Sequence, residues 1–221
     1  MFFQGLLPSR SLANIGIEKV LAYENQSSFY VGLIGGTGQG KSTLINAILK
    51  EPNLLPTHSL RACTAVVVEI AYNGSDDKSA LYRAEVEFVE ADGWQKELEV
   101  LFRDVDAHFE DSEFADIDED LDRLSRIKEG LAMFKNVYPH LRSIDELRST
   151  SVSKLMQYGN VRRVLGSTKN IRNANLNAFA KAIRPYIATN DLDNLDFWPM
   201  IKCVKVFVKA PILESGIVLV E

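Results

Sequence analysis

The stretch that decides the fold is FYVGLIGGTGQGKSTLINAIL, from Phe29 to Leu49. It opens on a short apolar run typical of a strand, passes through a glycine-rich turn and ends with helical spacing of its apolar residues. Within it, GGTGQGKS, from Gly35 to Ser42, matches the pattern G-x-x-x-x-G-K-[ST]. A strand before this pattern and a helix after it are the context in which it binds phosphate. The sequence therefore predicts a phosphate-binding loop.

The residue types of this loop follow from the chemistry. Successive backbone N–H groups must turn inward around phosphate oxygens, and glycine permits the backbone angles and the close approach. Lys41 can reach the β- and γ-phosphates as a cation, and the Ser42 hydroxyl can bind Mg²⁺. The N-terminus of the following helix adds a favourable dipole. The alternative is a bare glycine-rich turn.

Composition bounds the class of protein. The chain has 221 residues, 46% of them hydrophobic and 25% charged, which suits one core or a core with a smaller lobe. A net charge of −5 gives no overall support for a nucleic-acid binder. Cys63 and Cys203 form no Cys-x-x-Cys pair, so we expect neither a disulfide framework nor a zinc site, and a reducing intracellular compartment. No run approaches the ~20 apolar residues of a membrane-spanning helix.

The remaining pattern predicts an α/β protein with a helical insertion. Residues 11–24 have amphipathic helical spacing. We expect AVVVEIAY (65–72) to be a buried strand, paired in antiparallel fashion through a short turn with LYRAEVEFVEA (81–91). From about residue 94 to 187 the spacing is helical, and strand character returns only at 201–210 and 215–221. The order of elements predicts a three-layer architecture around one sheet.

Thr64 is the candidate that separates kinds of nucleotide-binding protein. It lies in LLPTHSLRACTAVVVEI, Leu54 to Ile70, at the end of a loop and the start of a strand. In GTPases a threonine placed this way closes over the nucleotide, binds Mg²⁺ through its hydroxyl and contacts the γ-phosphate. The alternative is that Thr64 simply begins a β-branched strand.

The two motifs together, GGTGQGKSTLINAIL and LLPTHSLRACTAVVVEI, resemble the first motif and switch I of the dynamin-like large GTPases, within a group that has nuclear and fungal members. The resemblance covers residues 30–70 and implies a Ras- and dynamin-like P-loop NTPase fold, with GTP and Mg²⁺ as ligands. It implies that Ser42 and Thr64 bind the metal, and that Lys41, Thr64 and Gln39 serve catalysis. The nucleotide-binding residues carried over are Gly35, Gly36, Thr37, Gly38, Gln39, Gly40, Lys41, Ser42 and Thr43.

The sequence also departs from this family. Thr37 and Gly38 stand where dynamin has a glutamine and its catalytic serine. Gln39 is then a candidate to orient water, and the alternative is that it is a loop residue that faces solvent. No Asp-x-x-Gly follows the last strand, and Glu221 falls where the third motif's aspartate would begin. No Asn/Thr-Lys-x-Asp motif reads guanine, and we interpret STKN (167–170) as a chance match inside the helical insertion.

We therefore expect the first part of a G domain, of marginal stability alone and uncertain as an enzyme. The predicted division is an N-terminal helix and half-domain (1–90), a helical insertion (91–195) and return strands (196–221). The alternatives are an ATP-binding P-loop protein and a truncated, non-catalytic interaction module. The resemblance implies self-association through the G domain and a nuclear or cytoplasmic location.

Overall fold

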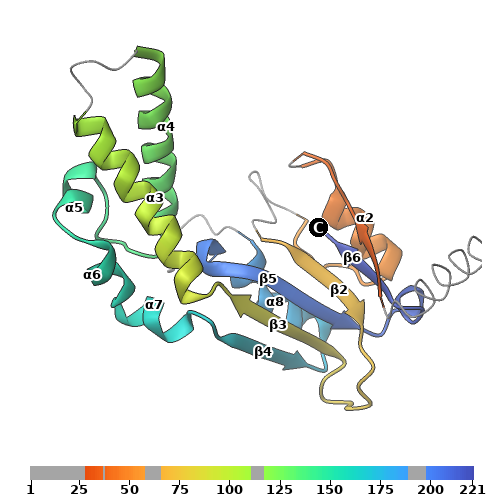
Figure 1. Ribbon diagram of the computed structural model, residues 1–221. Coiled ribbons are helices and arrows are strands. Elements are labelled where there is room, and N and C mark those ends of the chain that lie inside the picture. Colours follow the sequence, from red (N-terminus) through yellow and green to blue (C-terminus); the bar gives the residue numbers. More distant parts are fainter. Residues whose placement is uncertain (1–27, 37, 58–65, 111–116, 189–197) are drawn as a thin grey trace, which may run out of the picture.

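The computed structural model describes residues 28–36, 38–57, 66–110, 117–188 and 198–221. They form one six-stranded sheet with helices, and a helical arm that projects beyond one end of the sheet (Figure 1). The helix predicted at 11–24 lies outside the described residues. The strands are β1 (Phe29–Gly32), β2 (Val68–Tyr72), β3 (Tyr82–Phe88), β4 (Thr168–Asn173), β5 (Ile201–Val208) and β6 (Ile217–Val220). The helices are α2 (Lys41–Leu49), α3 (Ala91–Glu110), α4 (Ile117–Phe134), α5 (Ile144–Arg148), α6 (Val152–Met156), α7 (Gly159–Val164) and α8 (Leu176–Ile187).

The order of the strands in the sheet is β1-β6-β2-β5-β3-β4. β6 runs parallel to β1 and antiparallel to β2, while β2 and β5 are parallel. The carboxyl ends of β1 and β6 therefore meet at the same edge as the amino end of β2. This edge carries the glycine-rich loop, which follows β1.

One face of the sheet is the hydrophobic core. The buried side chains of β3 alternate along the strand, as expected when only one face is covered. Tyr82 on this face packs against Phe179 of α8, with ring centroids 5.7 Å apart. Its hydroxyl also contacts Glu51, just after α2. Both α8 and the end of α2 therefore lie on this face of the sheet.

The opposite face of β3 and β5 carries charged side chains. Glu87 pairs with Lys205 across the two strands, and Arg83 lies over the ring of Phe207, 5.1 Å from its centroid. These residues are partly exposed. The alternation of apolar and charged residues along β3 and β5 thus separates a covered face from a polar one.

The predicted pairing of β2 with β3 is wrong, because β5 lies between them. β3 pairs in antiparallel fashion with both β5 and β4. Residues 73–81 bridge across β5 and are organised by buried Asn73, whose backbone N–H donates to Val208 O (2.9 Å) and whose side chain donates to Ala80 O and Leu81 O (both 2.9 Å). Strand β5 (201–208) is distant in sequence from both of its neighbours. It has enough apolar residues to be buried between two strands, and it lies between β2 and β3.

The expectation of helix throughout residues 94–187 also needs correction. Thr168–Asn173 is strand β4 at the edge of the sheet, so STKN does not lie in a helical segment. β4 is polar and exposed, which is typical of an edge strand and explains why its pattern gave no strand signal. Helix α8 follows it and packs on the sheet through Phe179, Ile183 and Ile187, all fully buried.

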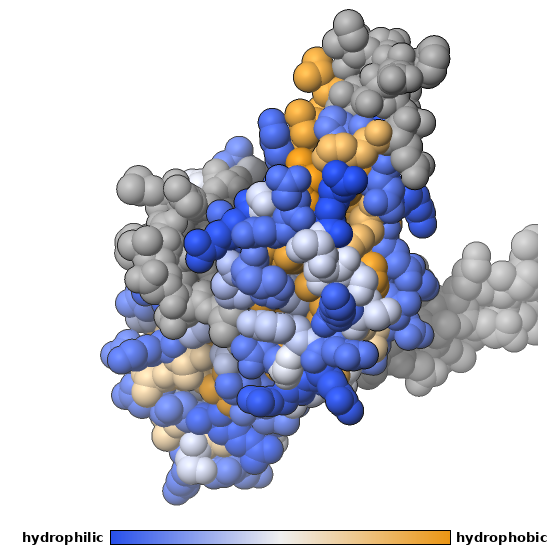
Figure 2. Space-filling view, turned by 90° about the vertical axis from the view of Figure 1, so that its left-hand side faces the viewer, coloured by the Kyte–Doolittle hydropathy of each residue, from blue (hydrophilic) through white to orange (hydrophobic). Residues whose placement is uncertain are grey.

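Helices α3 to α7 form the projecting arm. Its base is an aromatic cluster in which Trp94 of α3 donates from Nε1 to the hydroxyl of Tyr138 at 2.9 Å and packs edge-on against Phe134. Hydrophobic side chains gather in a narrow band along the arm, with hydrophilic residues on either side (Figure 2). Exposed apolar side chains of the arm include Val100 of α3 and Leu121 of α4, which is 59% exposed.

Strand β1 is exposed along its whole length, although it pairs with β6. Tyr30 is 66% exposed, and Ile34 after the strand is fully exposed. Apolar side chains of this strand are therefore uncovered.

Candidate functional site

The glycine-rich loop joins β1 to α2 at the edge of the sheet where the carboxyl ends of β1 and β6 lie. Gly38 and Gly40 have φ angles of 79° and 86°, a left-handed backbone that L residues with a Cβ rarely adopt. Gly40 is also the residue that caps the N-terminus of α2, which begins at Lys41. The chain thus turns sharply and presents the first N–H groups of α2, which no residue of the helix accepts. This is the arrangement expected of an anion-binding loop.

The Lys41 ammonium is held across the mouth of this loop. Its Nζ donates to Gly35 O at 3.0 Å and to Gly36 O at 3.2 Å. An ammonium has three donors, so one stays available for a phosphate oxygen. The loop's own carbonyls therefore hold the cation in place before any ligand binds.

The Gln39 side chain folds back over the loop. Its Oε1 accepts a hydrogen bond from Gly36 N at 2.9 Å, and a Cβ on Gly35 would lie only 2.7 Å from this oxygen. In this structure the Gln39 side-chain oxygen therefore accepts a hydrogen bond from one of the N–H groups of the phosphate loop. A side chain at position 35 would therefore have to displace the flexible Gln39 side chain from this contact.

Ser42 makes the contact that defines the site. Its Oγ donates to Glu221 Oε1 at 2.8 Å, and Ser42 is only 7% exposed. The second carboxylate oxygen, Oε2, is buried and has no hydrogen-bond partner among the residues that the structure describes. A carboxylate oxygen withdrawn from water without a partner is costly, so a group that pairs with it would be favoured.

Glu221 is the site residue that the sequence analysis missed. It was noted as the place where a third motif would begin, but not assigned to the site. The parallel pairing of β6 with β1 brings it there: Gly32 lies opposite Val220, and Leu33 N donates to Val220 O at 2.8 Å. An acidic residue directly after an apolar strand was the available signal, because strands that run parallel to the P-loop strand end at the same edge.

The same edge receives the start of β2. The backbones of Glu221 and Val68 exchange two hydrogen bonds, of 2.9 and 3.0 Å. Thr64, the proposed switch residue, precedes Val68 by four positions but lies outside the described residues, as do Thr37 and Cys63. The structure therefore brings Lys41, Ser42 and Glu221 together and leaves the role of Thr64 as a prediction.

A second link ties α2 to the segment that leads toward Thr64. Asn46, one turn after Ser42, donates from Nδ2 to Leu55 O and accepts from Leu55 N, both at 2.9 Å. Asn46 is 7% exposed and Leu55 is buried. This bidentate contact fixes residues 53–57 to the helix of the phosphate loop.

No group of three or more metal-binding side chains (His, Cys, Asp or Glu) occurs among the described residues. Ser42 and Glu221 supply a hydroxyl and a carboxylate, the hard oxygen ligands that Mg²⁺ prefers when phosphates complete its coordination. In the part of the chain that the structure describes, no helix is long and apolar enough to cross a membrane.

Comparisons with known proteins identify a family. Residues 31–185 match the family model described as "Dynamin family". Two relatives named "Nuclear GTPase SLIP-GC" are 26% identical: the mouse protein over 216 residues (93% of this chain, 26% of the relative) and the human protein over 207 residues (87% and 24%). The chain thus spans about a quarter of the length of these relatives.

Among solved structures, a chain of an oligomerised bacterial dynamin pair is similar at 19% identity and a TM-score of 0.44, covering 94% of this chain and 21% of that one. The family match extends over most of the chain, from β1 and the phosphate loop into α8. The chain belongs to the dynamin family.

Proposed function

We propose that this chain is part of a dynamin-type G domain that binds GTP with Mg²⁺ and hydrolyses it. The observation that carries the proposal is the contact between Ser42 Oγ and Glu221 Oε1 beside the phosphate loop, with Glu221 Oε2 buried and without a hydrogen-bond partner among the described residues. A bare glycine-rich turn needs no carboxylate at this place. A site for a metal-bound triphosphate does.

The residues fit Mg²⁺. Ser42 and Glu221 would hold it, Glu221 directly or through water, and Thr64 would join them as the switch residue. The chemistry that Mg²⁺ would supply there is to offset the negative charge of the phosphates. Glu221 stands where this family has aspartate, and its longer side chain reaches the Ser42 hydroxyl at 2.8 Å.

The protein's own groups act mainly by position and charge. Lys41 binds the β- and γ-phosphates, and the N-terminal N–H groups of α2 bind phosphate oxygens. Thr64 helps to place the attacking water, and Gln39 is the second candidate for that role once it leaves Gly36 N. Residues 35–43 would therefore bind the nucleotide, with Lys41, Thr64 and Gln39 as catalytic groups.

The wider assignments rest on the same reasoning. We assign residues 1–90 and 196–221 to the G domain and the range 91–195 to an insertion, of which β4 and α8 pack with the sheet. A nuclear location follows from relatives that are named nuclear GTPases. Self-association through the G domain is the partner that the family resemblance implies.

Titration calorimetry with Mg²⁺·GTP and Mg²⁺·ATP tests the proposal. We expect GTP to bind, and its affinity to fall by about tenfold or more when Mg²⁺ is chelated. Preference for ATP would favour the alternative of an ATP-binding P-loop protein, and no binding would favour a non-catalytic interaction module. Thr64→Ala should lower affinity and turnover; if it changes neither, the switch assignment is wrong.

Glu221→Gln tests the metal role directly. Glutamine keeps an acceptor for Ser42 but removes the charge, so the Mg²⁺ dependence of GTP affinity should be lost. The matched control is Glu129→Gln, since Glu129 also accepts from a serine, Ser125 Oγ at 3.4 Å, but on the exposed face of α4. Equal Mg²⁺ dependence in both variants would contradict the assignment.

A further inference from the structure

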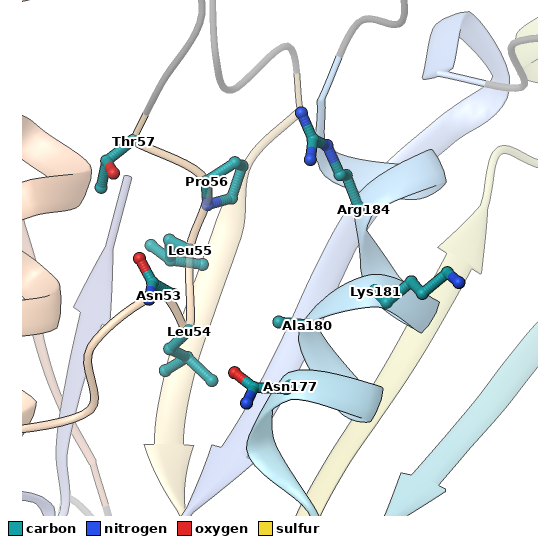
Figure 3. Close-up of a pocket in the computed structure, with 9 residues that line it drawn as sticks. All are labelled: Asn53, Leu54, Leu55, Pro56, Thr57, Asn177, Ala180, Lys181 and Arg184. Carbon is teal, nitrogen blue, oxygen red and sulfur yellow. The ribbon is translucent and has the colours of Figure 1, made fainter.

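A pocket that is separate from the phosphate loop lies between residues 53–57 and helix α8. Its volume is about 300 Å³. This is at the lower end of the range for small-molecule sites. Figure 3 shows the extended segment 53–57 on one side and α8 on the other, with side chains from both converging on the space between them. None of the residues proposed above to bind GTP lines it.

The pocket is apolar at its floor and polar at its rim. Leu54 and Leu55 form the floor and are buried, at 0% and 1% exposure, and Pro56 and Ala180 add to it. Asn177 and Arg184 stand on the α8 side of the rim. A ligand that fits such a lining has an apolar body and a group that pairs with polar donors.

The charge at the rim is positive. Among the residues that the structure describes, neither Arg184 nor Lys181 forms an ion pair or side-chain hydrogen bond, and none of the described lining residues is acidic. In Figure 3 the Lys181 ammonium points to the far side of α8, whereas the Arg184 guanidinium lies at the upper end of the pocket. A guanidinium presents a planar fork of donors that matches carboxylate and phosphate. Arg184 is therefore the group to recognise an anion.

The wall of this pocket is connected to the nucleotide site. Leu55 is held by Asn46 of α2 through two hydrogen bonds of 2.9 Å. Asn53 and Thr57 line a second hollow against α2, which Thr43 of the phosphate loop also lines. Asn53 adopts a left-handed backbone, with φ of 68°, which asparagine tolerates in turns, so the segment turns sharply between the two hollows.

We propose that the pocket between residues 53–57 and α8 binds a small organic anion, a carboxylate or phosphate monoester with an apolar body, and is an effector site for the nucleotide site. A ligand that bridges Arg184 and the Leu54–Leu55 floor fixes the segment 53–57 against α8. Because Asn46 binds the same segment, and the chain continues from it toward Thr64, ligand binding changes GTP affinity. This second step rests on the proposed function, whereas ligand binding does not.

Ligand-observed NMR of the 221-residue chain, without nucleotide, tests the binding step. The probes are benzoate and phenyl phosphate, which share the apolar ring and differ in the anion. We expect at least one of them to bind, and Arg184→Gln to weaken that binding by about tenfold, the effect of removing one charged hydrogen-bond partner. Lys181→Gln, one turn away on α8, is the matched control and should leave binding unchanged.

Lys41→Ala separates this pocket from the phosphate loop, which also attracts phosphate. Probe binding that survives Lys41→Ala and fails in Arg184→Gln supports the proposal. No binding of either probe, or equal loss in Arg184→Gln and Lys181→Gln, overturns it. Loss only in Lys41→Ala places the probe in the phosphate loop and also overturns it.

The effector role is tested by measuring GTP affinity with and without the bound probe. We expect a shift of about threefold or more in the native chain and none in Arg184→Gln. Arg184-dependent probe binding without a shift in GTP affinity overturns the effector role. If GTP does not bind at all, the proposed function fails while the NMR result still decides whether the pocket binds the anion.

Discussion

Replacing Asn46 by alanine tests the link between the phosphate-loop helix and the segment 53–57. The change removes the acceptor for Leu55 N and the donor to Leu55 O, both in buried hydrogen bonds of 2.9 Å. Each buried backbone group left without a partner costs about 1–3 kcal/mol. Asn46 also lines a hollow that can admit water, which would partly restore these bonds. We therefore expect Asn46→Ala to lower the free energy of unfolding by about 2–4 kcal/mol, in the lower part of the range for two such backbone groups together.

Such a loss is a large share of the ~5–15 kcal/mol that stabilises a typical domain. Urea denaturation followed by circular dichroism measures it. Asn46→Asp separates hydrogen bonding from packing, because aspartate has the same size but faces Leu55 O with a second acceptor. It should be at least as destabilising as alanine.

The control is Asn136→Ala, since half-buried Asn136 donates to Ala132 O at 3.3 Å in an exposed hydrogen bond that should contribute less than about 0.5 kcal/mol. The reasoning would be refuted by a loss below about 1 kcal/mol in Asn46→Ala. It would equally fail if Asn46→Asp were as stable as the native chain.

Two further predictions concern the loop and the arm. Gly40→Ala should lower the free energy of unfolding by about 1–2 kcal/mol, measured by thermal unfolding, and weaken Mg²⁺·GTP binding, because Gly40 has φ of 86°. The control is Gly159→Ala, which should change little because φ is not positive there and nothing is found within 4 Å of an added Cβ. Equal effects of the two changes would contradict the argument for the loop. Burial raises the pKa of Tyr138 from 10.0 to about 12, against the opposing effect of the Trp94 hydrogen bond. Since the unfolded chain loses this proton first, the resulting stability is present below pH 10 and is lost as the pH rises to about 12. Alkaline denaturation of Tyr138→Phe should show a smaller loss over this interval, and an unchanged curve would refute the assignment.

The phosphate loop was predictable because its determinants are local. The glycines that adopt positive φ, the lysine and the serine all occur within eight consecutive residues, and the flanking strand and helix follow from their own periodicity. The strands β2, β5 and β6 were predictable for the same reason, since each is a short apolar run.

The sequence could not decide which strands are neighbours. Residues 201–208 lie between β2 and β3 because a central strand buries apolar residues against two partners, and this gain depends on the whole sheet. Edge strand β4 gave no signal because its exposed positions place few constraints on residue type.

The sequence by itself determined that this chain carries a phosphate loop on a strand–turn–helix unit and resembles the dynamin family. Only the tertiary structure placed Glu221 against Ser42 and buried Glu221 Oε2, which has no partner in the described part of the chain. The physical reason is the parallel pairing of β6 with β1, which brings the ends of two strands far apart in the sequence to one edge of the sheet. In the same way, Arg184 and residues 53–57 line one pocket only because α8 and the end of α2 lie on the same face of the sheet.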